Sequence, residues 1–358
     1  MHNQDLATLA LHADNDVLQE SDIAPPVHLS TTFRYRNSLD GHEGSGGPRI
    51  GPFVYSRDRA PSRTRLETVL LAMIGGPTLT YASGLAAVNA YLVFLKPKRV
   101  AIGVGYYGSR QAVELYQQLT ACEVLGHEDL DSLQDGDVIH LETPFNPTGE
   151  AKTYLIVDST FAPPGIQDPF GFGVDIVMHS GTKYFGGHHD LPCGTLSISH
   201  DREEQWFKNL HDQHTILGSV LGSMEVWLGL RSLRTLELRT RRQNENAAHL
   251  VRWIDECLQN EGDNVVKMTV SGMPNGFGPV FALEMKTENM SRRLTGLLSL
   301  FQHATSLGGV KSQVEWRRLV DPSSKPSLLR VSVGAEHIDD LKTDLLRGFE
   351  SLLNTTRV

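Results

Sequence analysis

The run of residues 175–190 constrains this chain more than any other stretch, because an apolar strand there leads into a small, polar, glycine-rich loop. Lys183 stands in the middle of that loop, and Ser180 and Thr182 place hydroxyl groups beside it. Three nearby glycines remove side chains that would keep a ligand away from the backbone. A lysine that serves only solubility needs none of these features, whereas a lysine that forms a Schiff base beside a bound phosphate needs all of them.

Composition narrows the class of protein and of partner. At 358 residues and 40% hydrophobic content, the chain is long enough for a large core and, we expect, two domains. The formal net charge is −9 and no basic stripe with interleaved aromatic residues is present, which argues against nucleic acid or a membrane as a partner. No apolar run approaches the roughly 18 residues of a membrane span, and residues 1–16 lack the apolar core of a signal peptide. The three cysteines form no CxxC pair, so we expect a cytoplasmic protein.

Hydrophobic patterning predicts three regions along the chain. Residues 1–55 hold few periodic segments and indicate an N-terminal arm that lies on a neighbouring subunit. We expect a large, ligand-binding α/β domain over residues 56–235 and a smaller α/β domain over residues 236–358.

The large domain is expected to contain a mostly parallel sheet. Its predicted strands are nearly continuous in apolar residues, as strands buried on both faces would be, and they fall at residues 78–82, 99–105, 137–143, 154–160, 175–181 and 194–200. Helices are predicted at residues 65–74 and 83–95, and a long helical stretch at residues 218–260 leads into the small domain. That domain has predicted strands at residues 265–271, 279–285 and 328–333 and a closing helix at residues 337–353.

The connection between the strands at 137–143 and 154–160 conflicts with this arrangement. Parallel neighbours need a crossover of about a dozen residues or more, usually a helix. The ten residues before Tyr154 are instead turn-forming. Either the two strands are not joined as proposed, or a crossover helix has been lost. We hypothesise that a segment is missing from the numbered chain between Thr153 and Tyr154, which a break in the chain there would support and a continuous chain would contradict.

Asp158 is the first candidate partner for Lys183. A pyridoxal phosphate site needs a lysine, a carboxylate at the pyridine nitrogen, donors around the phosphate and a flat side chain over the ring. Asp158 ends an apolar strand 25 residues before Lys183, where α/β sheets bind ligands, and there it would keep a pyridinium protonated. The alternative is that Asp158 caps a turn or a helix.

Two further segments could hold a phosphate. The turn Ser83-Gly84-Leu85 is a strand-to-helix junction with free N–H groups, although Ser83 is also simply a good helix cap. Tyr55 and Arg57 end the N-terminal glycine-rich loop and could clamp a phosphate with a hydroxyl and a guanidinium. The alternative for this pair is a solvated charge beside an interface tyrosine.

Tyr107 and Arg330 complete the candidates. Tyr107 follows a predicted strand and could lay its ring over the cofactor, although aromatic residues at strand ends usually serve packing. Arg330 is embedded in an apolar strand and needs an anion, either a substrate α-carboxylate or a structural salt-bridge partner. His188 and His189 have no partner at the spacing of a metal motif, so we expect no metal site.

Taken in order, these residues resemble one enzyme family over nearly the whole chain. The motifs that carry the resemblance are Tyr55-Ser-Arg57, Tyr81-Ala-Ser-Gly84, Tyr107-Gly108, Glu142-Thr-Pro-Phe-Asn-Pro-Thr148, Val157-Asp-Ser-Thr-Phe161, His179-Ser-Gly-Thr-Lys-Tyr184, Ser306-Leu-Gly-Gly309 and Leu329-Arg-Val-Ser-Val-Gly334. Together they are similar to the Cys/Met-metabolism (transsulfuration) family of pyridoxal phosphate enzymes, which includes cystathionine γ-synthase, the cystathionine lyases and methionine γ-lyase.

The resemblance implies a fold and a set of roles. It implies the PLP-dependent transferase fold type I, similar to aspartate aminotransferase, in a homotetramer built from two active dimers. Lys183, Tyr107 and Asp158 would be catalytic, as aldimine lysine, ring-stacking proton shuttle and partner of the pyridine nitrogen. The cofactor, pyridoxal 5'-phosphate, would also be held by Ser83, Gly84, Leu85, Ser180, Thr182 and, from the neighbouring subunit, Tyr55 and Arg57. The substrate carboxylate would face Asn146, Ser306 and Arg330.

The resemblance also implies a reaction on an amino acid. Lys183 would take the Cα proton, and a γ-substituent would leave through a quinonoid and a vinylglycine-type intermediate. We expect γ-replacement on an O-acylhomoserine or cystathionine slightly ahead of γ-elimination, because Thr305 and residues 315–317 depart from the usual lyase pattern. The alternatives are β-elimination on the same scaffold and, more remotely, a binding protein that keeps the fold without catalysis. The family also carries a helix before the segment that contains Asp158, which is the helix missing here.

Overall fold

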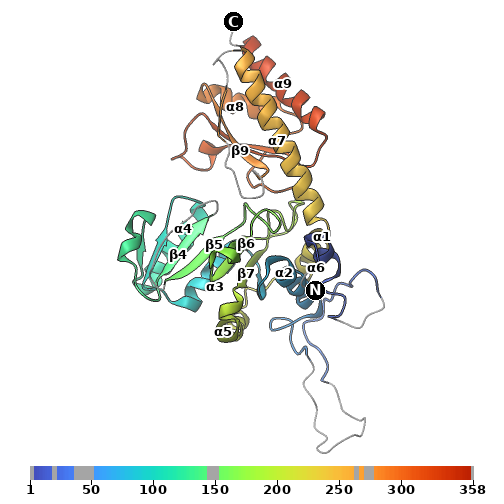
Figure 1. Ribbon diagram of the computed structural model, residues 1–358, viewed down its shortest axis with the longest axis vertical. Helices are drawn as coiled ribbons and strands as arrows, with labels where there is room; N and C mark the ends of the chain where they lie inside the picture. The colour runs from blue at the N-terminus through green and yellow to red at the C-terminus, as the bar shows by residue number, and fades with distance from the viewer. Residues whose placement is uncertain are drawn as a thin grey trace, which may run out of the picture. The chain divides into compact units, whose positions relative to one another are not determined.

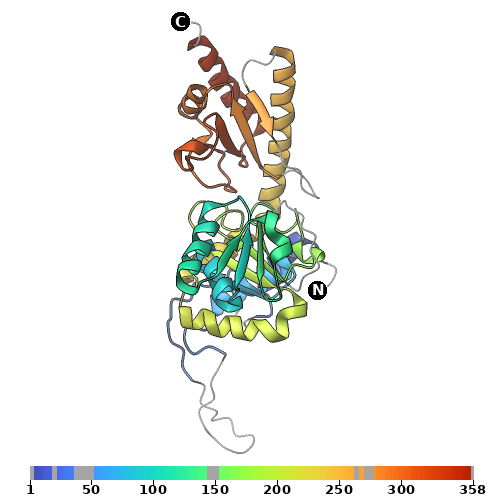
Figure 2. The ribbon, with the colours of Figure 1, turned by 90° about the vertical axis from the view of Figure 1, so that its left-hand side faces the viewer.

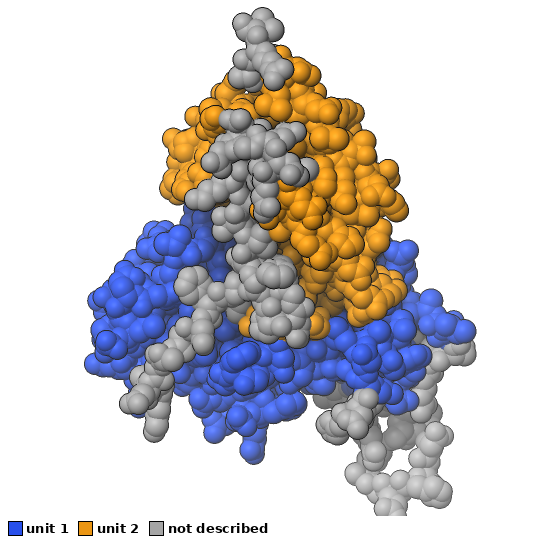
Figure 3. Space-filling view, turned by 45° about the horizontal axis from the view of Figure 1, so that its top comes forward, with its two compact units in different colours: residues 1–160, 168–182, 191–234 blue, residues 161–167, 183–190, 235–358 orange. Residues whose placement is uncertain are grey.

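The computed structural model describes residues 4–17, 22–35, 52–142, 153–261, 266–269 and 278–355. The chain divides into two compact units, coloured in Figure 3. Unit 1 comprises residues 1–160, 168–182 and 191–234, and unit 2 comprises residues 161–167, 183–190 and 235–358. Within the described ranges, every helix is too short or too polar to cross a bilayer.

Unit 1 is built on a seven-stranded sheet of mostly parallel strands (Figure 1). The strand order is β1 (Thr78–Tyr81), β7 (Gly194–Ile198), β6 (Ile176–Ser180), β5 (Tyr154–Asp158), β4 (Val138–Glu142), β2 (Arg99–Ile102) and β3 (Glu123–Leu125). The strands from β6 to β3 run parallel, whereas β7 is antiparallel to both of its neighbours. The predicted mostly parallel α/β architecture is therefore confirmed. Because β7 reverses direction directly after β6, the loop between them begins at the carboxyl edge of the parallel strands.

Helices cover this sheet and form its core with it (Figure 2). The helices of unit 1 are α1 (Leu6–His12), α2 (Pro61–Ile74), α3 (Gly84–Leu95), α4 (Tyr107–Thr120), α5 (Glu203–Leu217) and α6 (Ser223–Leu233), with short 3-10 turns η1 (His127–Ser132), η2 (Pro169–Phe172) and η3 (His200–Arg202). Helix α3 packs on β1, β6 and β7, with α4 and α5 beside it, and α2 packs on β1 and α6. The almost entirely apolar sequence of α3 suits this central position, and its Val88, Tyr91 and Leu92 are fully buried.

Unit 2 has a five-stranded sheet of its own. Its elements are α7 (Leu236–Glu261), β8 (Val266–Thr269), β9 (Val280–Met285), α8 (Glu288–Leu297), β10 (Gln302–His303), β11 (Gln313–Trp316), η4 (Arg317–Leu319), β12 (Leu328–Ser332) and α9 (Ile338–Thr355), and the strand order is β10-β11-β12-β9-β8. All pairs are antiparallel except β10 with β11. Strand β9 alternates between buried and half-buried side chains, the pattern of a sheet with one well-covered face.

Most predicted elements are present, with some shifted boundaries. Helix α3 begins at Gly84, where the Ser83 hydroxyl accepts a hydrogen bond from a backbone N–H of the first turn. Helix α2 begins at Pro61, four residues before the prediction, because proline is favoured at the first position of a helix. The long helical stretch predicted at 218–260 is two helices, α6 and α7, and helices α1, α4, α5 and α8 were not predicted.

The structure tests one of the two explanations for the short β4–β5 connection. The two strands are parallel neighbours, with Val138 opposite Tyr154 and Glu142 opposite Asp158. The first explanation is therefore wrong, because the two strands are joined as proposed. The numbered sequence carries no break between Thr153 and Tyr154, so its continuity does not test whether a segment is missing there, and that hypothesis stays a prediction. At about 3.3 Å per residue, the intervening residues 143–153 can reach about 36 Å, whereas a five-residue strand is about 17 Å long. A return without a helix is therefore sterically possible.

Candidate active site

Strands β5 and β6 end side by side and are tied together by one threonine. Asp158, the last residue of β5, is 8% exposed, and its Oδ1 accepts hydrogen bonds from the backbone N–H and the hydroxyl of Thr160. The same hydroxyl oxygen accepts the backbone N–H of Ser180, the last residue of β6, at 2.7 Å. The predicted turn-capping alternative for Asp158 is therefore present. The same contacts fix the carboxylate at the carboxyl edge of the sheet.

Three of the predicted phosphate-binding residues lie together. A Cβ atom on Gly84 would come within 3.2 Å of the Ser180 Cβ and 3.3 Å of its hydroxyl oxygen, so α3 begins directly against the end of β6. A Cβ on Gly194 would come within 2.1 Å of the Ser83 carbonyl oxygen, so this close approach also requires glycine on β7. Backbone N–H groups at the start of a helix, beside two serine hydroxyls, favour a phosphate. Leu85 is the next residue of this helical turn and is 40% exposed.

Thr182 holds the start of the β6–β7 loop. Its hydroxyl accepts the backbone N–H of Cys193 at 2.9 Å and contacts the Cys193 carbonyl at 3.3 Å. Because this hydroxyl is already engaged within the loop, the observed role of Thr182 is to close the loop across its base. Lys183 follows directly in the chain.

Tyr107 lies at the first position of α4, the helix that follows β2 in the chain. Its side chain is half exposed, and its ring centroid lies 5.0 Å from that of Tyr106. The backbone N–H of Tyr106 donates to Glu142 Oε1 at 2.7 Å, so the carboxylate at the end of β4 positions the residue before Tyr107. A Cβ on Gly105 would come within 2.6 Å of the Glu142 carboxyl carbon, which explains the glycine there.

Glu142 and Asp158 form a close carboxylate pair at this edge. They are opposite each other on β4 and β5, and with His140 each places one side-chain nitrogen or oxygen atom within 4.8 Å of the others. Burial and, next, the Asp158 charge raise the pKa of Glu142 to about 7. His140 is buried, its Nδ1 lies 3.0 Å from the Tyr91 hydroxyl, and burial lowers its pKa to about 4. At neutral pH the imidazole is therefore uncharged.

Unit 2 brings Lys183, Ser306 and Arg330 into one chain of contacts. Lys183 Nζ donates to the Ser306 hydroxyl at 2.7 Å, and Arg330 Nη2 donates to the Ser306 carbonyl at 2.9 Å. Ser306 has a φ of +87°, an uncommon conformation for a residue with a side chain. One serine thus joins an amine and a guanidinium that lie far apart in the sequence.

Arg330 also has a carboxylate partner. Glu315 lies opposite Arg330 across β11 and β12, is 3% exposed, and its Oε2 lies 2.7 Å from Arg330 Nη2. The same oxygen lies 2.7 Å from Arg317 Nη1. The structural salt bridge considered for Arg330 is therefore present, and it involves a second arginine. Because only Nη2 is engaged among the described residues, the donors on Nη1 and Nε remain available to a ligand.

Helix α7 and the loop before β11 brace the segment that follows Lys183. Arg239 on α7 donates to the Tyr184 carbonyl at 2.9 Å, and Gln243 donates to the Gly309 carbonyl at 2.6 Å. Gly308 has a φ of +78°, and a Cβ there would lie 3.1 Å from the Lys183 carbonyl carbon and the Tyr184 nitrogen. The lysine is consequently held on a packed backbone.

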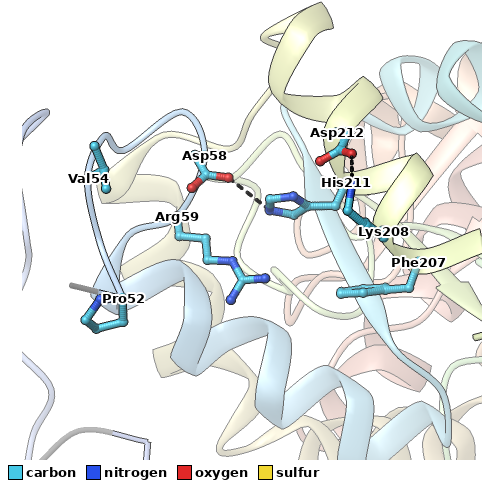
Figure 4. A pocket seen from close by; sticks show the side chains of 8 residues that line it. All are labelled: Pro52, Val54, Asp58, Arg59, Phe207, Lys208, His211 and Asp212. Carbon is cyan, nitrogen blue, oxygen red and sulfur yellow. Dashed lines mark hydrogen bonds and ion pairs between the residues drawn. The ribbon is translucent and has the colours of Figure 1, made fainter. Parts of the chain in front are cut away.

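The structure does not unite every predicted residue with this site. Tyr55 is 41% exposed, and the Arg57 guanidinium lies over its ring at 4.9 Å. Beside them is a cavity of about 400 Å³ that contains none of the predicted site residues and includes the Asp58–His211 ion pair (Figure 4). It is lined by Pro52, Val54, Asp58, Arg59, Phe207, Lys208, His211 and Asp212. Asn146 lies outside the described residues.

Sequence reasoning assigned no role to four residues that lie beside predicted site residues or their partners within the same unit: Glu142, His140, Glu315 and Arg317. The signal for Glu142 and His140 was their alternation on β4, which puts both on the face that carries Asp158 at the next strand. The signal for Glu315 was a carboxylate in an otherwise uncharged strand, and it was recognised only as a departure from the family pattern.

These residues fit pyridoxal 5'-phosphate. A cradle that only glycine permits lies against two serine hydroxyls, a fixed carboxylate ends the neighbouring strand, and an amine follows in the same loop. Fold and residues together define a PLP-dependent enzyme of fold type I.

The sequence model of the family described as "Cys/Met metabolism PLP-dependent enzyme" matches residues 7–350. The chain belongs to this family, and pyridoxal 5'-phosphate is its cofactor.

Individual relatives have several activities. The chain is 27% identical to cystathionine beta-lyase MetC of Bacillus subtilis (strain 168), over 92% of each chain. It is 31% identical to an L-methionine gamma-lyase of Streptomyces avermitilis, over 95% of this chain and 88% of the relative. Its structure is similar to that of cystathionine gamma synthase from Xanthomonas oryzae pv. oryzae in complex with cystathionine, with a TM-score of 0.83, 25% identity and coverage of 99% and 100%.

The alignments also show that this chain is shortened. The alignment with the B. subtilis beta-lyase runs over 375 positions, more than the 358 residues of this chain. The relative therefore has residues inside the aligned region that have no counterpart here.

Proposed function

We propose that this protein acts on a sulfur amino acid or an O-acylhomoserine and carries out γ-replacement, as in cystathionine γ-synthase, or γ-elimination. Bound pyridoxal 5'-phosphate supplies an aldehyde that takes up the substrate amine and an electron sink that stabilises a carbanion at Cα. The protein's own groups bind the substrate, hold the cofactor and move the protons.

The observation that carries the proposal is the chain of contacts from Lys183 through Ser306 to Arg330. An α-amino acid carries an amine and a carboxylate on one carbon. Its site therefore needs a lysine that holds the cofactor and a cation that binds the carboxylate, close together. Lys183 Nζ and Arg330 Nη2 both bond to Ser306. These contacts place an amine and a guanidinium against the same residue, as the two ends of an amino-acid head group require. Asn146 is proposed to add an amide contact to the same carboxylate.

The proton steps are assigned to three residues. Lys183 Nζ would hold the cofactor's aldehyde carbon, and its amine would be the base that takes the Cα proton of the bound substrate. The Asp158 carboxylate keeps the cofactor's ring nitrogen protonated, because an opposite charge at short range favours the charged form. Tyr107, half exposed at the start of α4, passes a proton to the leaving group.

The phosphate is proposed to lie at the start of α3. The N–H groups of Gly84 and Leu85 and the hydroxyls of Ser83, Ser180 and Thr182 would hold it, although the last hydroxyl is already bonded to Cys193.

The neighbouring subunit is proposed to complete the phosphate site with Tyr55 and Arg57. Both residues belong to a half-exposed segment, and their site would be incomplete without a second copy. We therefore propose a homotetramer of two active dimers, located in the cytoplasm. Its chain would be organised as an arm over residues 1–55, a PLP-binding domain over 56–235 and a small domain over 236–358.

Identification of products separates the candidate reactions. Purified protein loaded with pyridoxal 5'-phosphate is incubated with O-acetylhomoserine plus cysteine, and separately with cystathionine. Cystathionine from the first mixture, or 2-ketobutyrate from the second, supports γ-chemistry. Pyruvate as the dominant product from cystathionine would instead establish β-elimination, the second candidate, which is favoured by the identity to the B. subtilis beta-lyase.

A further inference from the structure

Arg330, whose side chain is 21% exposed, is paired with the buried Glu315, and an incoming carboxylate would meet this pair. Glu315 is 3% exposed, and its Oε1 accepts no hydrogen bond from any described residue. If Arg330 and Glu315 were alone, their charges would cancel, and a substrate carboxylate would bring a second negative charge to one guanidinium. Such an uncompensated charge is costly where water is largely excluded.

Arg317 changes this balance. Its Nη1 lies 2.7 Å from Glu315 Oε2, the same oxygen that pairs with Arg330 Nη2. Two guanidiniums therefore share one carboxylate, which leaves one unit of positive charge within this cluster. A single carboxylate ligand would bring the cluster to neutrality. Asp321 also lies near Arg317, but its carboxylate is partly exposed and already accepts hydrogen bonds from the Ser323 and Ser324 hydroxyls.

The position of Arg317 in the fold explains why this arginine, and not its neighbour Arg318, pairs with Glu315. It follows β11 directly, at the first residue of η4, so its guanidinium reaches Glu315 from two residues along the chain. Arg318, the next residue, points elsewhere and donates to the Ser324 carbonyl. The buried Tyr184 hydroxyl is the other titratable group that senses the Arg330 charge. Among the described residues, Arg317 alone shares the Glu315 oxygen with Arg330.

We infer that Arg317 is a specificity-determining residue for the substrate α-carboxylate, and that it acts by sharing Glu315 and so keeping Arg330 attractive to a carboxylate. The inference rests on the proposed function, since it takes Arg330 as the group that binds the carboxylate. It assigns Arg317 a positioning role without contact to the substrate.

A double-mutant cycle tests the inference on the PLP-loaded enzyme. The probe is butyrate, a carboxylate without the amine needed to react with the cofactor, and its dissociation constant is measured by isothermal titration calorimetry. Removing the charge in Arg317→Met should raise this constant about ten-fold, the size of one charge-assisted hydrogen bond. The double variant Glu315→Gln/Arg317→Met should return to within about three-fold of wild type, because Arg330 is then an uncompensated cation again.

The KM and kcat for L-cystathionine provide a second readout. The Arg317→Met effect should fall on KM more than on kcat, since the α-carboxylate contact is present before and during the reaction. Arg317→Lys should largely preserve butyrate binding, and Arg318→Met is the matched control that should leave it unchanged. A double variant that binds butyrate no better than Arg317→Met would overturn the inference, because a merely structural role predicts additive damage.

Two further variants keep the outcomes distinct. If Arg317→Met does not fold, Glu315→Gln alone decides, since the inference requires it to bind butyrate at least as tightly as wild type. Weaker binding by Glu315→Gln would refute the charge-sharing role. Arg330→Met tests the underlying assignment: if butyrate binding survives this change, the proposed function of Arg330 fails. If butyrate binding is lost there while the cycle is additive, only the inference about Arg317 fails.

Discussion

The candidate site residues of unit 1 and those of unit 2, each considered within its own unit, are held by different kinds of interaction. In unit 1, Asp158, Thr160 and Ser180 are joined by hydrogen bonds to backbone N–H groups at the ends of adjacent strands. In unit 2, Ser306 joins Lys183 through its hydroxyl and Arg330 through its carbonyl, and a buried carboxylate joins two arginines. Hydrogen bonds to backbone groups set where the side chains of unit 1 lie, whereas the ion pairs of unit 2 also set the net charge around Arg330. The first part is therefore expected to tolerate changes of charge better than the second.

The largest expected effect comes from Lys183 in unit 2. On its proposed role, replacing it with alanine would remove both the covalent attachment of the cofactor and the base for the Cα proton, so turnover should fall by about 10²–10⁴-fold or more. The measurement is the rate of 2-keto acid formation from cystathionine, together with borohydride reduction of the yellow chromophore. Lys208→Ala, at an exposed ion pair on α5, is the control and should behave as wild type. Full turnover by the Lys183 variant would refute its assigned role.

Asp158→Asn tests the corresponding residue of unit 1. Asparagine can still accept the bonds from Thr160, so the fold should persist, while the negative charge is lost. Affinity for pyridoxal 5'-phosphate should fall by about 10–10³-fold, the effect of one opposite charge on a nearby titrating group. Fluorescence titration of the cofactor-free protein measures it. The exposed Asp168→Asn is the matched control, and equal affinity in both variants would contradict the role of Asp158.

Glu142 gives the smallest effect, seen as a pH dependence of stability. Its folded-state pKa, raised to about 7 by burial and by Asp158, exceeds its ordinary value of 4.5. Between pH 4.5 and 7 the unfolded chain binds fewer protons at Glu142 than the folded chain does. The contribution of Glu142 to stability is therefore complete below pH 4.5 and is lost as pH rises through 7. Relative to Glu142→Gln, the wild type should lose roughly 2 kcal/mol of stability between pH 5 and 8, after allowance for solvent screening. Urea unfolding of the cofactor-free protein measures this, and parallel pH profiles would disprove it.

The unit 1 part of the site could be predicted closely from the sequence. An apolar strand that ends in Asp158 and a helix that begins after Ser83 are local signals, readable from neighbouring residues. The same reasoning gave the fold class and most strands. It missed α5, because the sequence of this helix is mostly polar and has few apolar positions to mark a buried face. The contacts of α5 with α3 and β7 are seen only in the structure.

The unit 2 part could be predicted only as isolated residues. That Arg330 meets Glu315 depends on the register of β11 against β12, and a shift of one residue would place Glu315 on the opposite face. No local pattern fixes that register. The role of Arg317 depends on it in turn, which is why its sequence showed only a departure from the family pattern. The link from Lys183 to Ser306 likewise depends on tertiary packing.

That link also bears on the order of events during synthesis. Ser306 follows Lys183 by 123 residues, and unit 2 takes residues 183–190 from inside the sequence of unit 1. At roughly 5–20 residues per second, a ribosome makes the lysine about 6–25 s before its serine partner. Unit 1 can begin to fold in that interval, but the nascent lysine loop must wait for the last third of the chain. A ribosome-bound chain that stops before Ser306 would therefore carry the phosphate cradle and the lysine without the contacts that position its amine.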